Sequence, residues 1–284
     1  MPLYRVVVLA VVQGATEFLP ISSTAHLVLV PWLFGWPDPG LTFDVALHVG
    51  TLIAVAVYFA RTWWRVIFLA FERRVLVPAP GSLDEDLYVN PRLFWFLVAA
   101  TVPAGLVGLA LEDLAETTLR SPFVIAVMMI GIGLVLWWAE QQSRFEKDLG
   151  KVSLSDSLAI GAAQALAIVP GTSRSGITMA AALFRGVNRA AAARFSFLLS
   201  TPIIAGAALK TAWNLLSHGG FPPGMGVALA TGILVSALSG YAVIAFFVRY
   251  LQTGTFRIFI WYRIICGIII LALAIFFRDP VGTL

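Results

Sequence analysis

The sequence predicts an all-α polytopic membrane protein with six transmembrane helices and two re-entrant helical hairpins, arranged as an inverted-topology repeat. The first observation is composition: of 284 residues, 60% are hydrophobic and 12% are charged, whereas soluble domains carry about 25% charged residues. The second is that six apolar stretches are long enough to cross a bilayer, and the third is that two shorter regions share one broken pattern. A soluble enzyme, a nucleic-acid-binding protein and, with a single cysteine, a disulfide-stabilised scaffold are excluded.

The first broken region extends from Leu3 to Phe34. Two apolar runs, 3–12 and 27–34, flank a polar centre, and neither reaches the roughly 20 residues that a spanning helix needs. Pro20 interrupts helical hydrogen bonding, so we expect two half-helices that meet at a turn. Such backbone at membrane depth must line a cavity or be buried, which predicts a re-entrant hairpin. The polar centre stands where a signal peptide would be cleaved, so no targeting segment is expected.

Three full spans follow, and the segment from 62 to 91, with Trp63, Trp64 and an amphipathic run at 66–71, is expected along the cytoplasmic interface. The second broken region extends from Leu158 to Phe184, with Pro170 in its polar centre. It predicts a second re-entrant hairpin for the same reasons, and three more spans complete the chain. The six spans are predicted at 41–60, 93–111, 122–139, 195–213, 225–248 and 258–277.

An internal repeat links the two halves. Pro20-Ile-Ser22-Ser23 and Pro170-Gly-Thr172-Ser173 share the pattern Pro, any residue, Ser or Thr, Ser, at an offset of 150 residues. Each copy precedes three spans, and an odd number of spans inverts the second copy. We therefore expect one membrane domain over 1–284, with repeat one at about 1–140 and repeat two at about 153–284, and a site near the midplane where broken helices meet.

Lysine and arginine positions predict the orientation, because these residues collect on the cytoplasmic side. If the segment after the first span is cytoplasmic, 14 of the 19 lie on or near that side and four lie opposite, which leaves Arg174 inside a hairpin. Both termini and the site would then face the outside. The 14 positions are Arg61, Arg65, Arg73, Arg74, Arg92, Arg144, Lys147, Lys151, Arg185, Arg189, Arg194, Arg249, Arg257 and Arg263, and the four are Arg5, Arg120, Lys210 and Arg278.

Ionisable residues at membrane depth are costly and by default mark function. An isolated Glu17 would sooner be protonated than stay charged, so it needs a cation, and Arg174 is the predicted one. Gln13 lies one helical turn before Glu17 and either links helices by hydrogen bonds or belongs to the site. Asp44 and His48, four residues apart, are expected to be a supporting polar pair.

Hydroxyl residues mark the points at which the half-helices restart. Ser22, Ser23 and Thr24 follow Pro20, and each is either an N-cap or part of an anion site at a helix N-terminus. His26 shares a helical face with Ser23, so a hydroxyl nucleophile has candidate bases in Glu17 and His26.

A second anion site is predicted around Arg174, whose planar guanidinium suits phosphate oxygens. Gly171 permits close backbone approach, and the hydroxyls of Thr172, Ser173, Ser175 and Thr178 surround the arginine. In the alternative interpretation Arg174 only neutralises Glu17, and the two roles are compatible.

At these residues the chain resembles the bacterial undecaprenyl-diphosphate phosphatase family, the bacitracin-resistance type of integral membrane phosphatase. The resemblance covers essentially the whole chain and rests on Gln13-x-x-x-Glu17-Phe-Leu-Pro-Ile-Ser-Ser-Thr-x-His26 and Pro170-Gly-Thr-Ser-Arg-Ser-Gly-x-Thr178. It implies that the terminal phosphate of a C55 isoprenoid diphosphate is removed at the outer face of the cytoplasmic membrane, which recycles the lipid carrier for cell-wall synthesis. It also implies one pocket for both motifs and a divalent cation, Mg²⁺ or Ca²⁺, at Glu17. The family motif often opens with Glu where this chain has Gln13, which removes one metal-binding carboxylate.

The expected mechanism assigns catalytic roles to Glu17, Ser23, His26 and Arg174, with the diphosphate held by Arg174 and the helix N-termini. Ser23 attacks while Glu17 or His26 takes its proton, and direct attack by His26 is the competing hypothesis. Expected partners are the polyprenyl diphosphate, membrane lipids and a second copy of the chain in a homodimer, and no nucleic acid. The alternative function is an inverted-repeat transporter for the lipid monophosphate or another anion. The expected substrate-binding residues besides Arg174 are Gln13, Ser22, Thr24, Gly171, Thr172, Ser173, Ser175 and Thr178.

Overall fold

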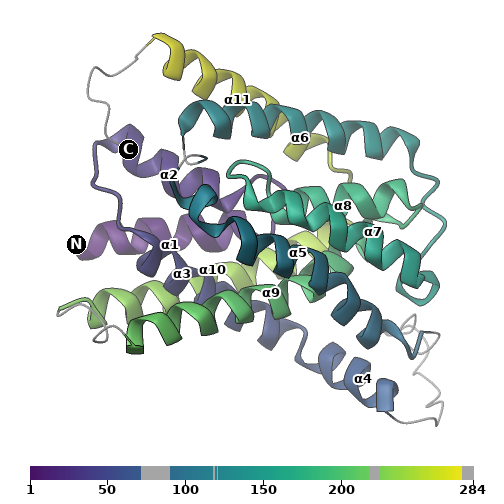
Figure 1. Cartoon of the computed structure of the whole chain (residues 1–284). Helices are drawn as coiled ribbons and strands as arrows, with labels where there is room; N and C mark the ends of the chain where they lie inside the picture. The colour runs from purple at the N-terminus through teal and green to yellow at the C-terminus, as the bar shows by residue number, and fades with distance from the viewer. Residues whose placement is uncertain (72–89, 118, 120, 218–223, 277–284) are drawn as a thin grey trace.

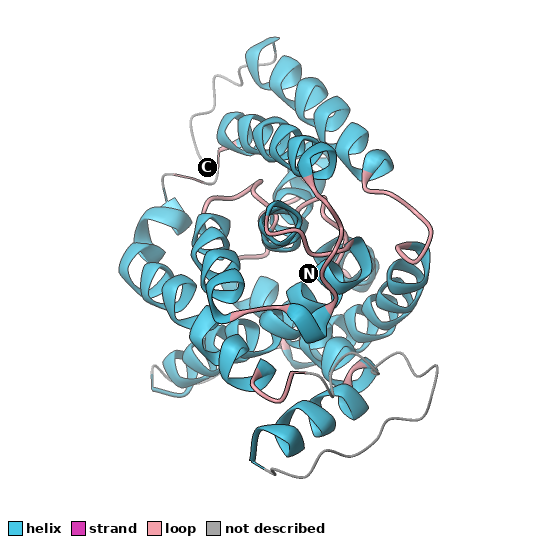
Figure 2. Ribbon diagram, turned by 90° about the vertical axis from the view of Figure 1, so that its right-hand side faces the viewer, coloured by secondary structure: helices cyan, strands magenta, loops and turns pink. Residues whose placement is uncertain are grey.

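The computed structural model describes residues 1–71, 90–117, 119, 121–217 and 224–276. Within these ranges the chain consists of helices and their connections, and its single β-bridge joins Lys147 to Val187. Figure 2 shows helices and loops without strands. The all-α prediction is confirmed.

Both broken regions form pairs of short helices. The first pair is α1 (Leu3–Glu17) and α2 (Ser23–Phe34), and the second is α7 (Leu154–Gln164), extended by the 3-10 helix η3 (Ala165–Ile168), with α8 (Arg174–Phe184). The two pairs lie toward opposite ends of the helix bundle in Figure 1. Helix α1 continues five residues beyond the apolar run at 3–12, because the polar segment from Gln13 to Glu17 is helical too.

Six longer helices match the six predicted spans. Five are long and apolar enough to cross a membrane in the described part of the chain, and α3 joins them as a sixth when counted with the helix that follows it. Helix α9 begins six residues before the predicted 195, because the polar turn from Arg189 to Arg194 is also helical. The bounds are α3 (Leu41–Tyr58), α5 (Leu93–Thr117), α6 (Pro122–Gln142), α9 (Arg189–Ser217), α10 (Gly226–Tyr250) and α11 (Arg257–Phe276).

Helix α4 (Ala60–Phe71) follows α3 at an angle of 69°. Thr62, Val66 and Leu69 form its buried face, whereas Trp64 and Phe71 are exposed. This is the pattern of a helix that lies on an apolar surface. The rest of the predicted interfacial segment, together with Arg73, Arg74, Arg120 and Arg278, lies outside the described residues.

The helix pairs are held by close packing against helices of the other half of the chain. Helix α1 packs against α10, α7 packs against α5, and α6 packs along α11. A Cβ atom at Gly161 of α7 would lie 2.7 Å from the carbonyl carbon of Ala100, and one at Gly14 of α1 would lie 2.7 Å from the amide nitrogen of Gly240. Only a residue without a side chain permits these backbones to approach so closely.

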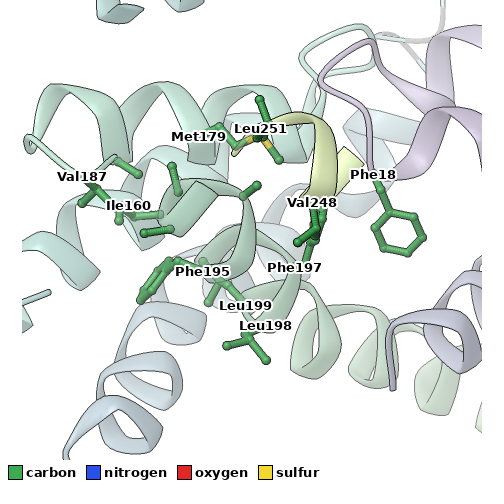
Figure 3. Packing of buried hydrophobic residues seen from close by; sticks show 14 of the residues in the cluster. Phe18, Ile160, Met179, Val187, Phe195, Phe197, Leu198, Leu199, Val248 and Leu251 are labelled. Carbon is green, nitrogen blue, oxygen red and sulfur yellow. The ribbon is translucent and has the colours of Figure 1, made fainter. Parts of the chain in front are cut away.

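A large apolar core supports the turn of each helix pair. Phe195 and Phe197 of α9, Met179 of α8 and Val248 of α10 belong to one buried cluster, part of which Figure 3 shows. Phe18, the residue directly after α1, joins it and packs edge-on against Phe197 with ring centroids 5.3 Å apart. The end of α1 is therefore fixed beside α9.

The repeat has a different register from the one that the motifs predict. Ser22 (φ 75°) and Ser173 (φ 67°) both have positive φ, and each is the N-cap of the helix that follows it. They are 151 positions apart, so the equivalent of Arg174 is Ser23, one position away from the motif alignment at an offset of 150. The difference arises because Pro20 stands two residues before its cap, whereas Pro170 stands three residues before its own.

Candidate active site

A cavity of about 300 Å³ lies where the two turns meet. Its polar wall comes from the end of α1, the N-termini of α2 and α8, α3 and the end of α7. Motif residues far apart in the chain, which the sequence predicts to share a pocket, are therefore neighbours in space. The polar and glycine residues of this wall are Glu17, Ser22, Ser23, Thr24, His48, Gly108, Gln164, Gly171, Ser173 and Arg174.

Glu17 is the centre of the polar network. Its Oε2 accepts hydrogen bonds from Ser23 Oγ at 2.5 Å and from Gln13 Nε2 at 3.0 Å. Its Oε1 accepts one from Arg174 Nη2 at 2.8 Å, which makes a buried ion pair. Both the predicted pairing of Glu17 with Arg174 and the shared face of Gln13 and Glu17 are confirmed.

Arg174 is oriented by a second contact, because its Nη1 donates to the carbonyl of Ser196 at 3.1 Å. These two bonds to described residues use two of the five N–H groups of the guanidinium. The side chain is 12% exposed and lines the cavity. It can therefore neutralise Glu17 and also present N–H groups to an anion.

The first turns of helices α2 and α8 lie at the cavity. Ser22 Oγ accepts from the amide of Ala25, and Ser173 Oγ accepts from the amide of Gly176 at 3.1 Å. Ser23 and Arg174 are the first residues of α2 and α8, directly after these caps. The partial positive charge of both termini favours a bound anion between them. Positive φ at two serines is a strained conformation, and strain of this kind gathers at functional sites.

His26 faces away from the cavity. Its Nδ1 lies 2.6 Å from the carbonyl oxygen of Ser22, and its Nε2 lies 2.7 Å from the hydroxyl of Tyr262, whose ring stacks on the imidazole. A carbonyl only accepts, so Nδ1 carries the proton and Nε2 accepts from Tyr262. Both ring nitrogens thus have partners other than Ser23, and His26 does not line the cavity.

His48 is the histidine that the structure brings to the site. Its Nε2 lies 3.5 Å from Glu17 Oε2, and its Nδ1 lies 2.7 Å from the backbone carbonyl of Asp44. The sequence predicts Asp44 and His48 as a supporting polar pair, and the ring of His48 contacts the backbone carbonyl of Asp44. Asp44 does not line the cavity. Helical spacing predicts that Asp44 and His48 lie close together, but it does not predict that Glu17 of α1 lies beside His48.

Three predicted site residues, Ser175, Thr178 and Thr172, do not line the cavity. Ser175 Oγ donates to the carbonyl of Leu19 at 2.9 Å and so joins the two turns. Thr178 Oγ1 bonds to the carbonyl of Arg174, and Thr172 is fully buried. Gly171 (φ 91°) does line the cavity, and a Cβ there would lie 2.6 Å from the carbonyl oxygen of Ile125. Close packing on α6 thus requires glycine at this position.

The position of Arg263 differs from the position that the sequence predicts. The sequence assigns it to the cytoplasmic end, yet it is fully buried between the two turns. Its Nη1 donates to Pro20, its Nη2 to Gly171, Thr172 and Met128, and its Nε to Met129, all at carbonyl oxygens 2.8–3.2 Å away. The carbonyls of Pro20, Gly171 and Thr172 lie in the turns, where they have no intrahelical partners, and this guanidinium satisfies them. The spacing of charges along α11 gives no sign of that role.

An apolar groove continues from the cavity between α3, α9 and α10. It has a volume of about 380 Å³, and Val45 and Ala208 line both spaces. Its remaining wall includes Ala46, Val49, Ala212, Leu229, Ala230 and Ile233. The polar wall of the cavity and the apolar groove together fit a molecule with an anionic head and an apolar tail.

The donor set limits how a metal could bind. No cluster of three His, Cys, Asp or Glu side chains suited to a metal occurs among the described residues. In the described part of the chain, Glu17 is the one carboxylate on the cavity wall. A divalent cation would therefore depend on further oxygen ligands from a bound molecule. Without such a molecule the wall offers a hydroxyl nucleophile, a carboxylate base and an anion cradle, the parts of a phosphoryl-transfer site.

Comparison with known proteins gives a consistent result. Residues 6–269 match the protein family described as bacitracin resistance protein BacA. The chain is 50% identical over 270 residues to the undecaprenyl-diphosphatase of Desulforudis audaxviator, covering 95% of this chain and 97% of that protein. It is 46% identical to the undecaprenyl-diphosphatase of Pelotomaculum thermopropionicum over 274 residues (96% and 97%) and to that of Moorella thermoacetica over 272 residues (96% and 98%).

Proposed function

The chain belongs to the family of bacitracin resistance protein BacA, and on this premise we propose that it is an undecaprenyl-diphosphatase. It hydrolyses undecaprenyl diphosphate to undecaprenyl phosphate and inorganic phosphate, which recycles the carrier for cell-wall synthesis and counteracts bacitracin. The observation that carries the proposal is the hydrogen bond of 2.5 Å from Ser23 Oγ to Glu17 Oε2, beside an arginine and two helix N-termini.

In the first step Ser23 Oγ attacks the terminal phosphorus and Glu17 Oε2 takes its proton. The bond from that phosphorus to the bridging oxygen breaks, and undecaprenyl phosphate leaves with the electron pair. A phosphate monoester is a stable leaving group and needs no strong general acid. Arg174 and the amides of both N-termini balance the charge on the transferring phosphoryl group.

In the second step the phosphoserine is hydrolysed. Glu17 first releases its proton to solvent, then takes one from a water molecule that attacks the phosphorus. The bond from phosphorus to Ser23 Oγ breaks, Glu17 gives the proton it took from water to this oxygen, and inorganic phosphate departs. His48 lies 3.5 Å from Glu17 Oε2 and is suited to relay protons between that carboxylate and the cavity.

The groove between α3, α9 and α10 supports a lipid substrate. A diphosphate bound between the N-termini of α2 and α8 would direct its isoprenoid chain past Val45 and Ala208 into this apolar space. Burial of a hydrocarbon chain there contributes about 0.8 kcal/mol for each methylene group removed from water.

A divalent cation is part of the proposal. Mg²⁺ is usually bound by one or two carboxylates together with substrate phosphates, and Glu17 provides such a carboxylate on the cavity wall. We therefore propose that Mg²⁺ or Ca²⁺ binds with the diphosphate, where it would offset the negative charge of the phosphate groups.

The proposed architecture is an inverted repeat with two re-entrant pairs, α1/α2 and α7/α8. The matching caps at Ser22 and Ser173 support it, as does the reciprocal packing of α1 on α10 and α7 on α5. The start of α1 and the end of α11 then lie on the outer side of the bacterial cytoplasmic membrane. The basic residues Lys147, Arg185 and Arg189, near the ends of α7, α8 and α9, would be cytoplasmic.

The test of the activity uses purified protein in detergent with undecaprenyl diphosphate, and free phosphate is measured. The wild type releases phosphate catalytically, whereas Ser23→Ala, Glu17→Ala and Arg174→Ala lose activity but keep their helical content. A matched control is Ser217→Ala, which alters an exposed hydroxyl at the end of α9. Full activity of Arg174→Ala would refute the anion cradle.

Trapping with substrate labelled in the terminal phosphate identifies the nucleophile. An acid-stable adduct supports Ser23, whereas an acid-labile and base-stable adduct points to a histidine, either His26 or the cavity residue His48. If phosphate is not released, but the lipid monophosphate crosses the bilayer of liposomes that contain the protein, the protein is a transporter and the proposed hydrolysis is wrong.

A further inference from the structure

Gln164 is a cavity residue to which the mechanism above gives no role. It is the last residue of α7, it is 2% exposed, and it lines the same cavity as Glu17 and Ser23. Neither its Nε2 nor its Oε1 has a hydrogen-bond partner within the described ranges. A buried amide without partners is costly and rare in proteins, so the group calls for an explanation.

The repeat explains why this amide is unpaired. Gln164 lies 151 positions after Gln13, the same interval that separates the caps Ser22 and Ser173. Gln13 donates its Nε2 to Glu17, one helical turn later. The position one turn after Gln164 is occupied by Ile168, which cannot accept a hydrogen bond. Gln164 therefore occupies the position in the second repeat that Gln13 occupies in the first, but it has no carboxylate partner one turn later.

The charges around Gln164 define the ligand that it can bind. The cavity holds the guanidinium of Arg174 and the positive ends of α2 and α8, an environment that favours an anion. A carboxamide N–H donates to a phosphoryl oxygen, and its carbonyl accepts from a protonated one. We propose that Gln164 is a further diphosphate-binding residue whose amide hydrogen-bonds the phosphate groups of the substrate. This inference rests on the proposed phosphatase function and deepens it.

The experiment compares the wild type with Gln164→Met and Gln164→Glu, which have nearly the same size as glutamine. Inorganic pyrophosphate serves as a tail-free probe, and its binding is measured by calorimetry in detergent with the full chain. Since a hydrogen bond to a charged group contributes about 1.5–3 kcal/mol, Gln164→Met should weaken pyrophosphate binding by about ten- to a hundredfold. Gln164→Glu should weaken it further, because it adds a negative charge. The KM for undecaprenyl diphosphate should rise in parallel.

The matched control is Gln252→Met, an exposed glutamine in the turn after α10, which should bind pyrophosphate like the wild type. If both Gln164 variants bind pyrophosphate as tightly as the wild type, the inference is wrong, whatever happens to their thermal stability. If Gln164→Met does not fold, Gln164→Glu alone decides. Because calorimetry needs no turnover, a wild type that binds pyrophosphate but releases no phosphate would refute the proposed function and leave the role of Gln164 standing.

Discussion

Ser22 and Ser173, which lie 151 positions apart, have nearly the same backbone conformation and the same capping role. Their φ and ψ angles are 75° and 95° for Ser22 and 67° and 107° for Ser173. Each accepts a hydrogen bond from the amide three residues later. Their neighbours Ser23 and Arg174 are thereby brought to the cavity from opposite halves of the chain.

Substitution at these caps should widen the usual preference of an N-cap for glycine over alanine. Ser173→Ala loses the cap bond, which costs about 1 kcal/mol, and keeps a side chain at positive φ. Ser173→Gly also loses the bond but relieves the strained backbone. We expect the glycine variant to unfold at a higher temperature than the alanine variant, as measured by circular dichroism in detergent.

The same comparison at Ser121, the N-cap of α6 with φ −81°, is the control. There the backbone conformation is unstrained, so glycine should exceed alanine only by the margin usual at an N-cap, which is smaller than the margin expected at Ser173. If Ser173→Ala were the more stable of its pair, the assigned strain would be wrong.

The elements could be predicted from the sequence because each depends on local patterns. The spans follow from the length of apolar runs, and the breaks follow from Pro20 and Pro170. The pairing of Glu17 with Arg174 could also be predicted, since a buried carboxylate needs a cation. The register of the repeat could not, because both motifs contain consecutive hydroxyl residues and only the backbone shows which one is the cap.

The sequence does not predict the roles of residues whose positions depend on tertiary packing. The sequence alone does not show that the ring of His26 contacts Tyr262 of α11, or that His48 of α3 lies beside Glu17. Arg263 resembles any arginine near the end of a span. Its role depends on five bonds to backbone carbonyls from α6 and both turns, which no side-chain pattern records.

Arg263 should be essential for stability. Lysine has three N–H groups and a different geometry, so Arg263→Lys leaves at least two of these bonds unmade, and Arg263→Met leaves all five unmade. Each buried carbonyl of the turns, at Pro20, Gly171 and Thr172, that is left without a donor costs about 1–3 kcal/mol. Thermal unfolding in detergent should therefore rank the wild type above Arg263→Lys and Arg263→Met last.

Arg257→Met provides the comparison on the same helix, since Arg257 is exposed at the start of α11. It should change the free energy of unfolding by no more than about 0.5 kcal/mol. Equal stability of Arg263→Met and Arg257→Met would show that the buried guanidinium does not hold the turns.

Binding of the divalent cation should depend on the diphosphate. With Glu17 as the one carboxylate on the described wall, titration of Mg²⁺ into the protein alone should give little heat. Addition of a non-hydrolysable methylene analogue of the lipid diphosphate should produce binding, and Glu17→Gln should abolish it. The exposed Glu146→Gln is the control and should bind like the wild type. Equally tight Mg²⁺ binding with and without the analogue would contradict this prediction.

The groove should determine how strongly the isoprenoid tail contributes to binding. Ala230 of α10 lines it, and phenylalanine at this position would occupy space that the tail needs. Loss of three or four buried methylene groups, at about 0.8 kcal/mol each, lowers the affinity for a long chain by roughly 50- to 200-fold. Ala230→Phe should therefore raise the KM for undecaprenyl diphosphate by up to this factor, whereas binding of inorganic pyrophosphate should stay unchanged. Ala242→Phe, an exposed position on the same helix outside the groove, should leave both values unchanged. If Ala230→Phe and Ala242→Phe have the same KM for the lipid, the tail does not follow this groove.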